Sequence, residues 1–99
     1  MGWASYHIEK LQRGETVQFR PHGQSMVPRI RSGQLCTVAP YGEGTPRVGD
    51  IVLCSCGGHQ YLHLISAVNN EQYQISNNRN HVNGWVTARS IYGRCILVE

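Results

Sequence analysis

The segment PHGQSMVP, residues 21–28, places a serine directly after a glycine-containing turn. A serine hydroxyl is a weak nucleophile, and it attacks a carbonyl only when a base lies within hydrogen-bond reach and donors stabilise the oxyanion. A tight turn can expose the Oγ of Ser25 and direct its backbone N–H toward that oxyanion. Taken alone, the position is also typical of an ordinary loop serine, since serine is common in turns.

A second group of residues could hold a metal. Cys54, Cys56, His59 and His63 follow one another at spacings of two, three and four, and thiolates and imidazoles are the ligands that zinc prefers. A C-x-C pair on one strand with histidines across a hairpin is, however, not a usual zinc spacing. The pattern favours free thiols buried beside a turn, and we expect no metal and no cofactor.

Composition limits the class of protein. A chain of 99 residues with 40% apolar and 15% charged residues has the length of one domain and is too apolar for a disordered chain. Its apolar runs are strand-length, which predicts neither a membrane anchor nor a signal peptide and favours the cytoplasm. The net charge of +3 comes mainly from scattered arginines, so nucleic acid is not the expected partner.

The pattern of the chain predicts a mainly β domain. Residues 3–13 have the spacing of a short amphipathic helix, and Gly14 is suited to end it. Strand patterns are found in six segments, residues 16–21, 34–41, 50–56, 60–68, 71–76 and 89–99. Residues 41–50 and 77–84 are predicted loops. We expect one domain, residues 1–99, with a helix in 1–14 and a rolled sheet or distorted β-barrel in 15–99.

Five short boxes occur in a recognisable order along residues 17–96. They are the SMVP box around Ser25, the SGQ turn, the GDIV box at 49–52, the strand YLHLI, and the late polar segment SNNRNHVNG followed by IYG. In this order the chain resembles the serine peptidase group that contains type I signal peptidases and LexA-like self-cleaving repressors. The resemblance implies their mainly β fold, with a peptide or protein as substrate.

The resemblance also assigns roles to individual residues. Ser25 matches the nucleophile, and Met26 and Pro28 match the structural part of its box. At the position of His63, most members carry a lysine base, and some members carry a histidine base instead. The chain has a single lysine, Lys10, and no box covers it. The resemblance therefore implies a Ser25–His63 dyad.

One element of the histidine-type members is missing. They use an aspartate from the late polar box, whereas the only aspartate here, Asp50, belongs to the earlier Gly-Asp turn. The late box offers amides instead, and Asn77, Asn78 or Asn80 could orient the His63 ring by accepting from its N–H. An amide would not stabilise an imidazolium as a carboxylate does.

The sequence thus predicts a serine endopeptidase-like domain that cleaves an extended peptide. Two alternatives stay open. The chain could be a catalytically inactive peptide-binding module of the same fold, or a nucleic-acid-binding or zinc-stabilised β domain.

Overall fold

The architecture was obtained from a computed structural model that describes residues 2–99. One α-helix and seven strands follow in chain order. They are α1 (Ser5–Gln12), β1 (Val17–Phe19), β2 (Cys36–Ala39), β3 (Ile51–Cys56), β4 (His59–Asn69), β5 (Gln72–Ser76), β6 (Val82–Thr87) and β7 (Ile91–Val98), with a 3-10 turn at Ala88–Ser90 before β7. The predicted mainly β chain with one short N-terminal helix is confirmed.

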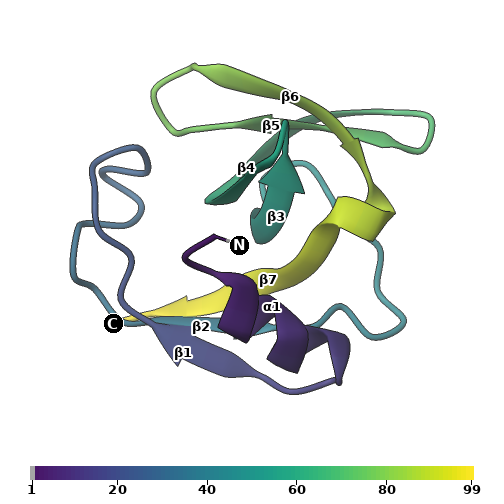
Figure 1. Cartoon of the computed structure of the whole chain (residues 1–99). Helices are drawn as coiled ribbons and strands as arrows, with labels where there is room; N and C mark the ends of the chain where they lie inside the picture. The colour runs from purple at the N-terminus through teal and green to yellow at the C-terminus, as the bar shows by residue number, and fades with distance from the viewer. Residues whose placement is uncertain (1) are drawn as a thin grey trace.

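The strands form one antiparallel sheet in the order β1-β2-β7-β3-β4-β5-β6. Figure 1 shows the sheet bent, with β1, β2, β7 and helix α1 in one half, β4, β5 and β6 in the other, and β3 between them. Among residues 2–99, β1 and β6 are the two ends of the sheet, so it does not close into the barrel that was one expected form.

Helix α1 is short, and two of its side chains are buried. Ile8 and Leu11, three positions apart, pack into the core, and Gly14 ends the turn with φ +84° while its N–H donates to the Leu11 carbonyl at 3.0 Å. In the part of the chain described by the structure, no helix is long and apolar enough to cross a membrane.

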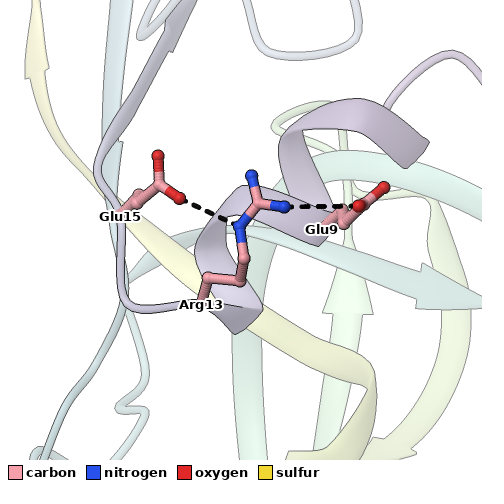
Figure 2. Close-up of polar contacts among 3 residues, drawn as sticks. All are labelled: Glu9, Arg13 and Glu15. Carbon is pink, nitrogen blue, oxygen red and sulfur yellow. Dashed lines mark hydrogen bonds and ion pairs between the residues drawn. The ribbon is translucent and has the colours of Figure 1, made fainter.

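Arg13, just after α1, bridges two carboxylates (Figure 2). Its guanidinium lies 3.4 Å from Glu9 and 3.0 Å from Glu15. All three side chains are about half exposed or more, so these ion pairs contribute little to stability.

The core lies on both sides of β3. Successive strand residues point to opposite faces. Leu53 packs with α1 and β2, whereas Val52 and Cys54 pack with Ile65 of β4 and Ile75 of β5. Both faces of β3 are therefore covered, and this strand pairs with the first half of β4, residues 59–64.

Candidate active site

Ser25, the predicted nucleophile, lies in the loop between β1 and β2, which is called the nucleophile loop after this prediction (residues 20–35). Two apolar side chains of the loop, Met26 and Ile30, are buried in the core, with 5% and 3% of their surface exposed. The Ile30 N–H also donates to the Met26 carbonyl at 2.9 Å, which closes a tight turn after the serine. The side chain of Met26, which follows Ser25, therefore anchors the loop, while Ser25 itself stays partly exposed. Pro28 is exposed and follows a cis peptide bond.

His63 faces this serine from β4. Its backbone pairs with Val52 of β3, and its side chain is buried, with 7% exposed. The imidazole Nε2 lies 3.2 Å from Ser25 Oγ, which is hydrogen-bond distance. The Tyr61 ring stacks on the same imidazole at a centroid distance of 4.6 Å and an angle of 19°, so the ring is held on one face as well as at its edge.

The other ring nitrogen of His63 contacts a residue that sequence reasoning missed. Nδ1 lies 2.8 Å from Oδ1 of Asn83 in β6. Gly84 pairs with Ile75 and Val82 with Ser76, which leaves Asn83 as the extra residue of a β-bulge. Bulges re-aim side chains and are frequent beside active sites. This bulge directs an amide at the His63 ring.

Residues 82–87 lay partly in a segment predicted as a loop, because Asn-Gly is a typical turn pair. The signal for a strand was present in the run VNGWVT, which is rich in β-branched and aromatic residues. If that run is taken as a strand, Asn83 becomes the predicted orienting amide in place of the loop asparagines.

The three asparagines predicted to orient His63 lie elsewhere. Asn77 accepts from the backbone N–H groups of Arg79 and His81, at 2.8 and 2.9 Å, and so shapes the turn. Asn80 is exposed and occupies the left-handed region at φ +67°, which asparagine tolerates better than most residues. The structure corrects the prediction, because the amide beside His63 comes from the strand after this turn.

Asn78 holds the nucleophile loop instead. Its backbone N–H donates to the Ser25 carbonyl at 2.8 Å, and its Nδ2 donates to the Val27 carbonyl at 3.1 Å. Its Oδ1 accepts from Arg29 Nε at 3.0 Å. These three bonds join the turn after β5 to both sides of Met26, so Asn78 fixes the backbone that carries Ser25.

The Asp50 side chain makes its hydrogen bonds within the loop before β3. Its Oδ2 accepts from the Tyr41 hydroxyl at 2.8 Å and from the Arg47 N–H at 3.0 Å. Burial, together with the bond to this carboxylate, raises the pKa of Tyr41, so the phenol remains a donor. Among the described residues, the carboxylate of this one aspartate makes no hydrogen bond to His63.

Burial lowers the pKa of His63 below its ordinary value of 6.5. The hydrogen bond to Asn83 raises this pKa by a smaller amount, and the charge of His81 lowers it further. The imidazole is therefore neutral at pH 7. An amide oxygen can only accept, so the proton of neutral His63 lies on Nδ1, and the Nε2 lone pair is directed at Ser25.

The other reactive residues do not join this pair. Lys10 lies over the Tyr6 ring of its own helix, 4.8 Å from the centroid. Cys54 and Cys56 are buried free thiols, and burial raises the pKa of Cys54 to about 12, so it stays protonated. Among residues 2–99, no three His, Cys, Asp or Glu side chains are grouped closely enough to hold a metal ion.

A cavity of about 340 Å³ opens beside Ser25 and His63. Its lining comes from the nucleophile loop, from the first half of β4 and from Trp3. The arrangement places a hydroxyl, a neutral base and a concave, mostly apolar surface together. Such a combination can bind an organic ligand and transfer a proton from the hydroxyl.

Comparisons of the chain with protein-family models, with curated proteins and with solved structures found no match. The likeness to signal peptidases and LexA-like repressors therefore remains an expectation from the sequence boxes. The reaction that this site could perform depends on the geometry of Ser25, His63 and Asn83.

Proposed function

We propose that the chain is a serine endopeptidase-like domain in which Ser25 is the nucleophile and His63 the general base. The observation that carries the proposal is the His63 ring, which bridges Ser25 Oγ at 3.2 Å and Asn83 Oδ1 at 2.8 Å. A nucleophile, a base and a third group that orients the base is the arrangement that activates a serine hydroxyl.

In the proposed reaction, His63 Nε2 takes the hydroxyl proton while Ser25 Oγ bonds to the carbonyl carbon of the peptide. The tetrahedral intermediate collapses as the C–N bond breaks, and the imidazolium returns the proton to the leaving amine. Water then attacks the acyl ester with His63 again as base, which releases the acid and restores the serine. Throughout, Asn83 keeps the Nδ1–H directed away from Ser25.

The sheet offers a place for an extended peptide. Between His59 and His63, β4 pairs with β3 on one side, whereas its pairing with β5 begins only at Leu64. Within the described residues, the other edge of this half-strand has no ladder partner, and it borders the cavity at Ser25. A peptide added along this edge would bring its backbone to the nucleophile by β-augmentation.

The test is cleavage of a mixed-sequence peptide library, followed by mass spectrometry, with wild type, Ser25→Ala and the control Ser90→Ala. Ser25→Ala removes one oxygen from a partly exposed residue, so folding should be unchanged by circular dichroism. We expect cleavage by wild type and by Ser90→Ala, and at least a 10³-fold loss in Ser25→Ala, of the order seen when a nucleophile is removed. Equal cleavage by all three proteins would overturn the assignment.

One observation favours a second function. The partner of His63 is an amide, which cannot balance the imidazolium charge that forms during attack. A domain that kept the cavity and the strand edge without turnover would be a peptide-binding module. Binding of library peptides by wild type with no cleavage would identify that case.

A further inference from the structure

The cavity beside Ser25 is large and mainly apolar at its floor. Met26, Ile30 and Leu62 line it, and each is at least nine-tenths buried. Its volume of about 340 Å³ is within the range of about 300–1,000 Å³ found for ligand sites. The methyl side chain of an alanine in a ligand would leave most of this space unfilled. A larger apolar side chain would cover more apolar surface and therefore bind more tightly.

One wall of the cavity is Trp3, from the segment before α1. Its indole N–H donates to the Gln60 carbonyl at 3.0 Å, and its ring meets Phe19 edge-on at 5.5 Å. The Gln60 side chain holds the same segment twice, because Oε1 accepts from the Ala4 N–H at 2.7 Å and Nε2 donates to Ser5 Oγ at 3.1 Å. Trp3 is thus a fixed wall although 53% of it is exposed.

The rim of the cavity is basic. Arg20 and Arg31 line it, both are exposed, and His22 lies between them in the same loop. Within residues 2–99 the only ion pairs are the two made by Arg13, so neither rim arginine has a carboxylate partner. Arg20 donates to the Gly33 carbonyl at 2.9 Å, which holds its side chain across the loop. An acidic group on a ligand would complement these charges.

We propose that this cavity selects peptides that carry a large apolar side chain next to an acidic residue. Trp3 and Leu62 contact the apolar side chain, and Arg20 and Arg31 attract the carboxylate. The inference rests on the proposed function for the position of the cavity beside the bond that is cleaved. Recognition itself needs no turnover, so binding and cleavage can be measured apart.

Four fluorescent decapeptides test the proposal, identical except for the central pair Leu-Asp, Ala-Asp, Leu-Lys or Ala-Lys. Binding is measured by anisotropy with Ser25→Ala, so that cleavage cannot alter the ligand, and cleavage is measured with wild type. We expect the Leu-Asp peptide to bind about 10–100-fold more tightly than the Ala-Asp peptide, the range for apolar groups of this size. The Leu-Lys peptide should bind more weakly than Leu-Asp, and the difference should shrink as salt is added.

Variants separate the cavity from the rest of the surface. Trp3→Ala, made together with Ser25→Ala, should reduce the preference for leucine at least fivefold. The matched control is Trp85→Ala, because Trp85 is similarly exposed at 44% but lies on β6 outside the cavity lining. Likewise Arg31→Ala should weaken the preference for aspartate, and Arg89→Ala, an exposed arginine outside the lining, should not.

The outcomes distinguish the two proposals. Selective binding of Leu-Asp without cleavage by wild type would leave this inference standing and overturn the peptidase. Cleavage of the Ala-Asp peptide as fast as the Leu-Asp peptide, with equal affinities, would overturn the inference and leave the peptidase standing. Loss of the leucine preference in Trp85→Ala to the same degree as in Trp3→Ala would overturn the assignment to this cavity, and so would binding of none of the four peptides.

Discussion

Asn83 Oδ1 lies 2.8 Å from His63 Nδ1, and this contact pairs a buried imidazole with a neutral amide. The amide fixes the direction of the ring and supports its charged form only through a hydrogen bond, without the opposite charge that a carboxylate would supply. The pKa of His63 therefore depends on an uncharged partner. Asparagine differs from aspartate only in having an amide nitrogen in place of one carboxylate oxygen.

The first prediction concerns that partner. In Asn83→Asp, a carboxylate beside His63 should raise the pKa of the imidazole by about 1–3 units, because an opposite charge favours the protonated form. The better stabilised imidazolium should also raise kcat at the plateau of the pH profile. Both changes are measured in pH profiles of peptide cleavage. Asn83→Ala, which removes the contact, should lower kcat by about 10–100-fold, as a loss of ring orientation would. A profile unchanged in Asn83→Asp would show that Asn83 does not act through His63.

The second prediction concerns the pH dependence of the wild type. Burial lowers the pKa of His63 below 6.5, and a general base works only when deprotonated. The profile of kcat/KM should therefore rise along an acid limb centred below pH 6.5 and be flat at pH 7–8. His63→Ala should lose activity at every pH, whereas Lys10→Ala should match wild type, since Lys10 contacts Tyr6 in α1.

The free energy of unfolding should also depend on the protonation of His63. The unfolded chain binds a proton at His63 near pH 6.5, before the folded chain does, so the free energy of unfolding should decrease as pH falls below 6.5. Urea titrations from pH 7 to pH 5 on wild type and His63→Ala would measure this. An equal decrease in both proteins would contradict the assignment of the pH effect to His63.

The third prediction concerns the nucleophile loop. Asn78→Ala removes the donor to the Val27 carbonyl and the acceptor for Arg29. The loss should cost about 1–3 kcal/mol in the free energy of unfolding. It should also lower kcat more than it raises KM, since Ser25 loses its support. Asn69→Ala, an exposed asparagine at the end of β4, is the control. A stability loss with unchanged kcat would show that the loop does not depend on this clamp for its catalytic position.

The fourth prediction concerns Asp50. Asp50→Asn keeps an oxygen for Tyr41 and Arg47 but removes the charge that strengthens both bonds. We expect a loss of about 1 kcal/mol, or about 4–8 °C in melting temperature, with kcat and the pH profile unchanged. Thermal unfolding and cleavage assays on the same preparation check both parts. A large shift of the acid limb would instead assign Asp50 to the base.

The sequence was informative where local patterns decide structure. Residues 3–13 predicted the helix found at Ser5–Gln12, and alternating segments predicted six of the seven strands. These features depend on short-range periodicity and turn chemistry, which one sequence contains.

Long-range features were not readable in the same way. β6 was missed because Asn83-Gly84 is typical of a turn, yet here it lies in a bulge where Gly84 has φ +153°. The sheet also stays open although its strand count suited a barrel. Register and closure depend on pairing between segments that are distant in sequence, and no local pattern determines them.

The proposed site is assembled from three distant parts of the chain, with Ser25 in a loop, His63 on β4 and Asn83 in a bulge of β6. β4 and β6 do not pair with each other in the sheet, because β5 lies between them and pairs with both. A chain emerging from the ribosome would therefore have its serine exposed long before the base and its amide partner were in place. Activity would begin only after the second half of the sheet had formed. The proposed peptidase would thus stay inactive during synthesis until β6 had paired with β5.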